Sequence, residues 1–295
     1  MEQNPPRSGA TGNRPRLAII AISIWVLLQI PRLAALPIIQ SVLAGNDSTA
    51  WLYPAFVDTF IGITAPFLAF ALWRRTGLWV WMTALIWFSI SLFDHLDATT
   101  AALISPIPQA FMEGNQSTVL TSLLIGAVLD AIFLVVLTRR TMKSHYLGAI
   151  RTSDSTVAYP RTTMVITIVW VILQIPRYIA IPLVQNILAG NDPEAWLNPA
   201  IGDIIIATSA FFVLFAVWRK KGLWVWATVL IWLALSIFDH LSTVTAALTT
   251  PGPQLFGGGG PSASVAAVPF IQAVIDAVVF VLLARGKVRS YFLGP

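Results

Sequence analysis

Long apolar stretches alternate with short polar segments along the whole chain. Each stretch is at least as long as the roughly 20 residues that a helix needs to cross about 30 Å of hydrocarbon. The pattern predicts eight membrane-spanning helices, near residues 17–44, 54–73, 78–104, 118–138, 162–189, 199–218, 223–249 and 265–284. The first stretch is too long for the apolar region of a signal peptide, and no small-residue cleavage site follows it. We therefore expect a retained helix there.

The second half of the chain repeats the first. WVLLQIPR at 25–32 recurs as WVILQIPR at 170–177, and the segments LAGND, GLWVW and FDHL also occur once in each half. The offset is 145 residues up to Gln109 and 146 from Asp130 onward. The sequence predicts an all-α integral membrane protein of two tandem four-helix repeats, related by a pseudo-two-fold axis along the membrane normal. The predicted segments are a disordered tail at 1–16, repeat 1 at 17–138, a linker at 139–161, repeat 2 at 162–284 and a second tail at 285–295.

Two prolines lie inside the first span of each repeat. They are Pro31 and Pro37 in repeat 1, and Pro176 and Pro182 in repeat 2. Because proline removes a backbone donor, we expect these spans to be kinked or locally unwound.

Composition and charge support a membrane location. Only 11% of the residues are charged, against about a quarter in soluble domains, and there is no cysteine for a disulfide, a thiolate metal site or a nucleophile. The formal net charge is +5, and 16 of the 18 lysines and arginines lie at one side of the predicted spans. The positive-inside rule makes this side cytoplasmic, with both termini there and a multi-pass location in the plasma membrane. Membrane lipids explain these basic residues, so no nucleic-acid partner is expected.

Charged residues inside the predicted spans are the main candidates for function. They are the arginines Arg32 and Arg177, and the aspartates Asp58, Asp94, Asp97, Asp130, Asp203, Asp239 and Asp276. His95 and His240 join them. Such residues are costly in a membrane and usually face a protein interior or a wet cavity. A rise of about 1.5 Å per residue places Arg32, Asp58 and Asp94 in the outer half of the membrane, and predicts a second cluster of Arg177, Asp203 and Asp239. Asp130 and Asp276 fall nearer the cytoplasmic side.

Asp97 is the acid that breaks the match between the repeats, because Ser242 stands at its partner position. Each repeat has more acids than its single arginine can neutralise, so at least one carboxyl per repeat is expected to hold a proton. A structural ion-pair network is the competing interpretation of the matched residues. The asymmetry at Asp97 favours the first cluster as the active one.

Tryptophan is abundant, with 12 residues. Trp51, Trp79, Trp81, Trp196, Trp224 and Trp226 lie at predicted membrane edges and suggest an interfacial belt. Trp25, Trp87, Trp170 and Trp232 lie deeper and either pack or line a pocket. The chain has no Walker A motif, no dinucleotide fingerprint and no metal- or haem-binding histidine pair, so we expect no cofactor and no metal.

The intramembrane acids of FDHLD at 93–97, the all-helical pattern and the aromatic content resemble bacterial integral-membrane terpene cyclases that work without metal. The resemblance implies cyclisation of a lipophilic isoprenoid or meroterpenoid substrate, started by a protonated aspartate. The implied catalytic residues are Asp97, Asp94, Asp239, Asp276 and His95. The implied substrate-binding residues are Arg32, Arg177, Asp58, Asp203, Trp87, Trp232, Trp25 and Trp170.

A proton-coupled transporter or channel is the alternative hypothesis, because intramembrane carboxyls are common proton carriers. In that case Arg32 and Arg177 would bind an anionic solute. The sequence leaves the oligomeric state open, and also whether a cavity is central or lies within each repeat.

Overall fold

The computed structural model describes residues 15–109, 115–148, 160–219 and 222–293, and within them every regular element is helical. The first half contains α1 (Arg16–Leu27), η1 (Ile30–Ala35), α2 (Leu36–Leu43), η2 (Thr49–Trp51), α3 (Leu52–Arg74), α4 (Leu78–Ile104), α5 (Gln116–Thr138) and α6 (Arg140–Leu147). The second half contains α7 (Arg161–Leu173), η4 (Ile175–Ile179), α8 (Ala180–Leu188), η5 (Glu194–Trp196), α9 (Leu197–Arg219), α10 (Leu223–Thr249), η6 (Gln254–Phe256), α11 (Ala263–Ala284) and α12 (Gly286–Leu293).

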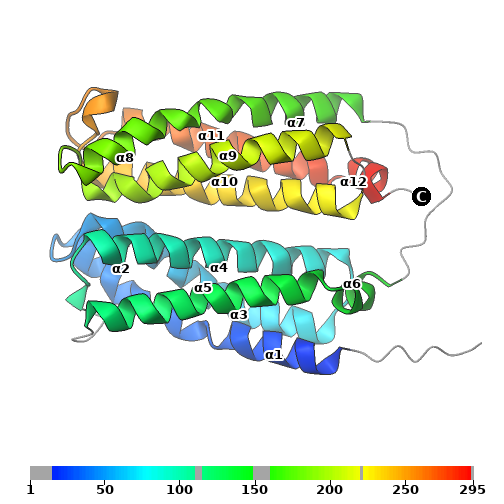
Figure 1. Ribbon diagram of the computed structural model, residues 1–295. Helices are drawn as coiled ribbons and strands as arrows, with labels where there is room; N and C mark the ends of the chain where they lie inside the picture. The colour runs from blue at the N-terminus through cyan, green and yellow to red at the C-terminus, as the bar shows by residue number, and fades with distance from the viewer. Residues whose placement is uncertain (1–14, 110–114, 149–159, 220–221, 294–295) are drawn as a thin grey trace, which may run out of the picture.

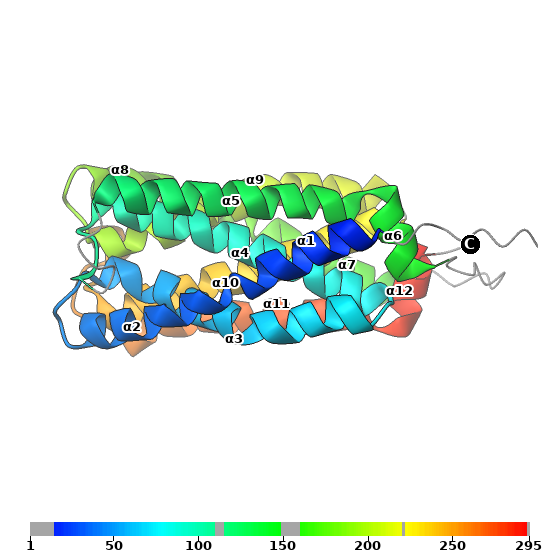
Figure 2. The ribbon, with the colours of Figure 1, turned by 90° about the horizontal axis from the view of Figure 1, so that it is seen from below.

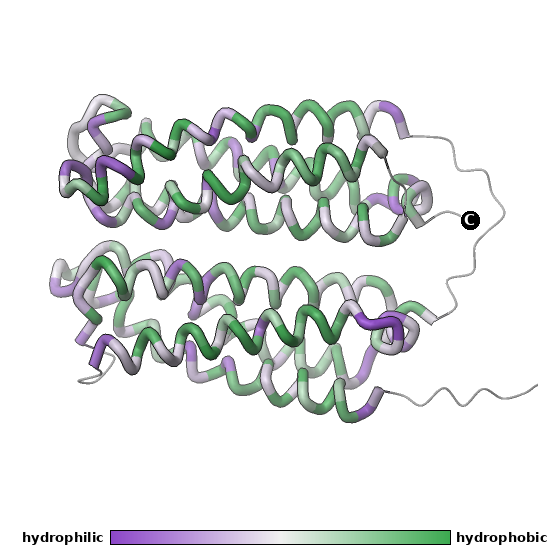
Figure 3. The backbone as a smooth tube through the Cα atoms, in the orientation of Figure 1, coloured by the Kyte–Doolittle hydropathy of each residue, from purple (hydrophilic) through white to green (hydrophobic). Residues whose placement is uncertain are grey.

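Within the described residues, eight helices are long and apolar enough to cross a membrane, each 22 to 28 residues in length. They match the eight predicted spans, and this is the pattern of a multi-pass membrane protein. Green, hydrophobic backbone makes up most of the helices in Figure 3, while purple, hydrophilic segments lie at their ends and at a few points along them. The described chain begins and ends at the same end of the bundle (Figure 1).

The predicted break in the first span of each repeat is confirmed. In repeat 1, α1 ends at Leu27 and the chain continues as η1, whose first turn contains Pro31, before α2 begins. In repeat 2, η4 with Pro176 separates α7 from α8 in the same way. In each repeat, the arginine (Arg32 or Arg177) therefore lies in the 3-10 turn, where the backbone hydrogen bonds of the α-helix are interrupted.

The two halves lie side by side as two helical bundles (Figures 1 and 2). The long central helices α4 and α10 contact each other across the interface. The Trp81 ring meets Trp224 of the other half edge-on, with ring centroids 5.3 Å apart. Near the start of α3, the Tyr53 hydroxyl donates to the Phe238 carbonyl at 2.5 Å. The pseudo-two-fold axis between the copies stays a prediction.

Short helices occur in the segments that the sequence assigned to the linker and the second tail. Helix α6 packs against α4 and α5, and α12 packs against α10 and α11. The Tyr146 hydroxyl donates to the Leu72 carbonyl at 3.2 Å, and burial raises the pKa of Tyr146 to about 12. Residues 1–14 of the predicted disordered tail lie outside the described residues.

The prediction of an interfacial tryptophan belt is wrong for four of its six residues. Trp51, Trp81, Trp196 and Trp226 are at most 2% exposed. Their indole N–H groups donate to the backbone carbonyls of Pro106, Leu137, Pro251 and Leu283 respectively. Carbonyls near a helix end lack an intrahelical partner, so an indole can satisfy them and dock one helix end on the next. Trp79 and Trp224, at 43% and 40% exposure, still fit the belt.

Trp226→Ala should lower the free energy of unfolding by about 3–5 kcal/mol, because it empties a buried site and frees the Leu283 carbonyl. Trp218→Ala is the matched control, since Trp218 is 73% exposed and its removal leaves no cavity. Equilibrium unfolding in detergent micelles measures both variants. Equal losses in the two would contradict a docking role for Trp226.

Candidate functional site

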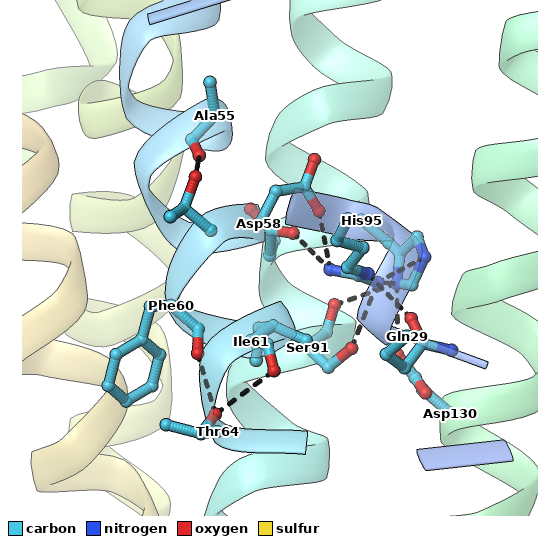
Figure 4. Close-up of polar contacts among 12 residues, drawn as sticks. Gln29, Ala55, Asp58, Phe60, Ile61, Thr64, Ser91, His95 and Asp130 are labelled. Atoms are coloured by element: carbon cyan, nitrogen blue, oxygen red, sulfur yellow. Dashed lines mark hydrogen bonds and ion pairs between the residues drawn. The ribbon is translucent and has the colours of Figure 1, made fainter. Parts of the chain in front are cut away.

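The guanidinium of Arg32 lies between two carboxylates inside the first bundle. Arg32 comes from η1, and its Nη1 is 2.9 Å from Asp58 of α3 and 2.7 Å from Asp94 of α4. The side chains of Arg32 and Asp94 are 11% and 2% exposed. The 3-10 turn thus joins three elements through one buried charge, as the sequence predicted for this triplet. Figure 4 shows this convergence around Asp58 and His95.

A second layer of polar contacts extends from the same guanidinium to α5. Nη2 of Arg32 lies 2.7 Å from Nε2 of His95, and Nδ1 of His95 lies 3.0 Å from Asp130. The Trp25 indole donates to the other carboxyl oxygen of Asp130 at 2.8 Å. Nη2 of Arg32 also lies 2.9 Å from Nδ1 of His95, so the guanidinium faces both ring nitrogens. The sequence placed Asp130 apart from the cluster, whereas His95 connects it to Arg32.

The matching residues form a similar network in repeat 2, in which the histidine lies farther from the acid of the fourth span. Arg177 Nη1 is 3.0 Å from Asp203 and 2.6 Å from Asp239, and Arg177 Nη2 also contacts His240. His240 Nε2 lies 3.4 Å from Asp276, whose other oxygen accepts from the Trp170 indole at 2.5 Å. Trp25 and Trp170, predicted to pack or line a pocket, are therefore hydrogen-bond partners of the deepest acids.

The two networks differ in how completely they are satisfied. In repeat 1, the Nε of Arg32 donates to the Gln29 side chain at 2.7 Å. In repeat 2, the Nε of Arg177 and both side-chain polar atoms of Gln174 are buried without a hydrogen-bond partner. Unmet buried donors are costly. Arg177 and Gln174 in repeat 2 therefore have unused hydrogen-bonding groups, whereas Arg32 and Gln29 in repeat 1 bond to each other.

The two repeats also differ at one position on the fourth span, which is Gly126 in repeat 1 and Gln272 in repeat 2. At Gly126 of α5, a Cβ atom would overlap the His95 ring, so glycine is what allows the imidazole to rest on the helix backbone. An offset of 146 makes Gln272 of α11 the partner of Gly126. With glutamine at this position, we expect that His240 cannot approach the backbone of α11 as His95 approaches that of α5. We missed this contrast in the sequence, although the aligned repeats contain it.

A pocket of about 400 Å³ lies in the second bundle, with walls from η4, α8, α9, α10 and α11. Its polar residues include Arg177, Asp203, His240 and Gln272, and most of the remaining wall is apolar. Phe256 of η6 and Trp196 contribute aromatic rings. The volume falls within the roughly 300–1,000 Å³ typical of ligand sites. The arrangement can hold an apolar molecule with its polar end near the ion pairs.

Of the predicted site residues, all of which lie in the described part of the chain, only Arg177 and Asp203 line this pocket. Asp97, Trp87 and Trp232 also take no part in the two ion-pair networks. Asp97 is 6% exposed, its Oδ2 has no hydrogen-bond partner, and its backbone carbonyl accepts from Asn198 of the other half at 3.1 Å. Trp87 and Trp232 are each 4% exposed and donate to hydroxyls of α3 and α9 at 2.9 Å. None of the three lines the pocket, so their positions fit packing between helices and between repeats.

Comparison of the chain with protein-family models, with curated proteins and with solved structures gave no match. The chemistry of the site is therefore inferred from its own residues.

Gly126→Ala should lower the free energy of unfolding by about 1–3 kcal/mol, because the added methyl group displaces the His95 ring from its contacts with Arg32 and Asp130. Gly286→Ala is the control, since a Cβ there meets nothing within 4 Å. Thermal unfolding in detergent compares the two. If Gly126→Ala is as stable as Gly286→Ala, the close approach of His95 does not constrain this position.

Proposed function

We propose that the protein is a multi-pass membrane enzyme that rearranges a lipophilic isoprenoid-type substrate by acid–base chemistry in the pocket of repeat 2. The observation that carries this proposal is the pocket itself, which combines apolar walls with Arg177, Asp203 and His240. A hydrocarbon chain fits the walls, and protonation and deprotonation of carbon need groups like those at its polar end. The isoprenoid class comes from the resemblance noted in the sequence.

The acid in this proposal is the carboxyl pair around Arg177. Asp203 and Asp239 contact the same Nη1 atom of Arg177, at 3.0 Å and 2.6 Å. A single guanidinium neutralises only one negative charge, so the two carboxyls would share one proton. Asp203 is the member that lines the pocket, so it would deliver the shared proton to an alkene carbon of the substrate.

The base would be His240. Protonation of the alkene leaves a carbocation, ring closure moves the charge along the chain, and loss of a proton to His240 restores a double bond. Asp276 lies 3.4 Å behind the imidazole and would stabilise the charge that His240 gains. Trp196 and Phe256 are the aromatic residues of the pocket wall, and their rings would favour a nearby cation. The product would be an isomer of the substrate.

Repeat 1 has a structural role in this proposal, which reverses our expectation from the sequence that the first cluster is active. Its Arg32 donors are occupied by Asp58, Asp94 and Gln29, and His95 rests on Gly126. Asp97 would stabilise the contact between repeats rather than donate a proton to the substrate.

The orientation and the symmetry also belong to the proposal. Arginines lie at the ends of α1, α3 and α7 on the side where the described chain begins and ends. The positive-inside rule then places both termini in the cytoplasm, with the protein in the plasma membrane and the repeats related by a pseudo-two-fold axis. The pocket would lie in the outer half of the membrane.

Turnover in D₂O tests the chemistry. Purified protein in lipid nanodiscs, incubated with farnesylated phenols and indoles, should give a cyclic isomer that carries one non-exchangeable deuterium, detected by mass spectrometry. Asp203→Asn should reduce the rate by about 10²-fold or more, because an amide cannot supply the proton.

Asp47→Asn is the control for that experiment, since it makes the same chemical change at the outer edge, where Asp47 contacts the Gln109 backbone. It should leave the rate unchanged. A cyclic product without deuterium, or full activity in Asp203→Asn, would refute protonation by this carboxyl pair.

The unbroken series of contacts in each repeat favours a second candidate, a proton-coupled transporter. The series runs from Asp203 through Arg177 and His240 to Asp276, and the matching residues form it in repeat 1. The carboxyls and the imidazole can bind and release protons, whereas the guanidinium between them stays charged.

Proteoliposomes with a trapped pH dye distinguish the two candidates. The enzyme proposal predicts that an imposed pH gradient decays no faster than in empty liposomes. Faster decay that Asp276→Asn abolishes, together with no turnover of isoprenoid substrates, would instead establish the transporter.

A further inference from the structure

We propose that the pocket of repeat 2 opens sideways into the lipid, between η4 and α11, and that it admits uncharged lipophilic molecules from the bilayer. This proposal rests on the proposed function and specifies the class of its substrate and the route by which that substrate arrives. It is supported by the mouth of the pocket, the depth of that mouth, the cover at the loop end and the charges inside.

The mouth of the pocket is apolar. Five of the residues that line the pocket are exposed, and all of them are apolar: Leu173, Pro176, Ile179, Phe256 and Val268. The first three come from the end of α7 and from η4, Phe256 comes from η6, and Val268 comes from α11. Leu173, Ile179 and Val268 are 55%, 57% and 61% exposed. An opening surrounded by exposed apolar side chains suits contact with hydrocarbon and not with water.

The mouth lies at a depth where lipid surrounds the protein. Leu173 and Val268 belong to two of the candidate membrane spans, Arg161–Leu188 and Ala263–Ala284, which run in opposite directions. At a rise of about 1.5 Å per residue, Leu173 lies about 18 Å beyond Arg161, and Val268 lies about 8 Å beyond Ala263. Both residues therefore fall within a hydrocarbon layer of roughly 30 Å.

The loop end of the pocket is covered by the segment between α10 and α11, which contains η6 (orange in Figure 1). The backbone N–H of Gln254 donates to the Asp192 side chain at 2.8 Å, and the Trp196 indole donates to the Pro251 carbonyl at 2.9 Å. These two bonds hold the segment against η5, and its Phe256 lines the pocket. Entry from the side therefore requires no movement of this segment.

The charges inside the pocket disfavour an anionic ligand. Of the three titratable side chains in the wall, Asp203 is the most exposed at 25%, against 7% for Arg177 and 3% for His240. The Nη1 atom of Arg177 already faces Asp203 and Asp239, and Nη2 faces His240. An anionic end group would lose its water in the apolar mouth and then meet a carboxyl. An uncharged end group avoids both costs.

Loading of farnesol into the full chain in lipid nanodiscs tests the route. Native mass spectrometry of protein released from the nanodiscs gives the fraction with bound farnesol at successive times. Val268→Trp and Ile179→Trp each place an indole in the mouth, so each should slow loading by about tenfold or more. Wild-type loading rates in both variants would overturn the side opening.

Val278→Trp and Ile166→Trp are the matched controls on α11 and α7. Both positions are exposed, at 53% and 41%, and neither lines the pocket. Both controls should load at the wild-type rate, and thermal unfolding verifies that each variant is folded. Slowing in the controls equal to that in the mouth variants would also overturn the route.

Farnesol and farnesyl phosphate have the same chain and different ends, so they test the class of ligand. The wild type should reach about tenfold or higher occupancy with farnesol, because the phosphate must lose its water and approach Asp203. Asp203→Asn should reduce this preference by about threefold to tenfold, whereas Asp47→Asn at the outer edge should leave it unchanged. Equal or higher occupancy with farnesyl phosphate in the wild type would overturn the restriction to uncharged molecules.

The outcomes also distinguish this proposal from the proposed function. Farnesol loading that the mouth variants slow, without turnover of any isoprenoid, would refute the acid–base chemistry and leave the side opening intact. Turnover of farnesylated phenols at the wild-type rate in Val268→Trp and Ile179→Trp would refute the side opening and leave the chemistry intact. No loading of the wild type by either probe would overturn both.

Discussion

A guanidinium buried among membrane helices is the constraint on which each bundle depends. An arginine in the middle of a membrane helix costs roughly 2.5–3.5 kcal/mol even on the mildest scale, unless partners surround it. Arg32 meets this requirement with Asp58 and Asp94, which come from two further helices. Because the charge is tolerable only when all three elements converge, the ion pairs fix the position of the broken first span against α3 and α4.

The break in that span and the ion pairs depend on each other. Without Pro31, a regular helix would satisfy its own backbone and present Arg32 on a different face. In the structure, the 3-10 turn directs the guanidinium into the bundle, and Gln29 and Ser91 complete its hydrogen bonds. Helices α1 and α2 lie on either side of this turn, and each of them contacts α3.

The polar networks of the two halves differ in their hydrogen bonds. Repeat 1 satisfies the arginine Nε with Gln29 and seats His95 on Gly126. Repeat 2 keeps the ion pairs of Arg177 but leaves its Nε unpartnered beside a pocket that contains Gln272. A glycine-to-glutamine difference on the fourth span thus accompanies the difference in how the two arginines are hydrogen-bonded.

Hydropathy, proline positions and the repeat were sufficient to determine the eight spans, the break in the first span of each repeat and the composition of the ion-pair triplets, because these depend on local apolar length, backbone donors and charge. Other features required the tertiary structure. The contact of His95 with Asp130, the burial of Trp81 and Trp226, and the pocket in repeat 2 depend on how helices distant in sequence lie against one another. Asp97 illustrates the limit most clearly: the sequence marked it as the exceptional acid, but only packing of the two halves placed it at their interface, beside Asn198 and away from the pocket. The position of a residue along its helix determines the depth of its side chain in the membrane. The residues that it contacts depend on how the surrounding helices are rotated and spaced.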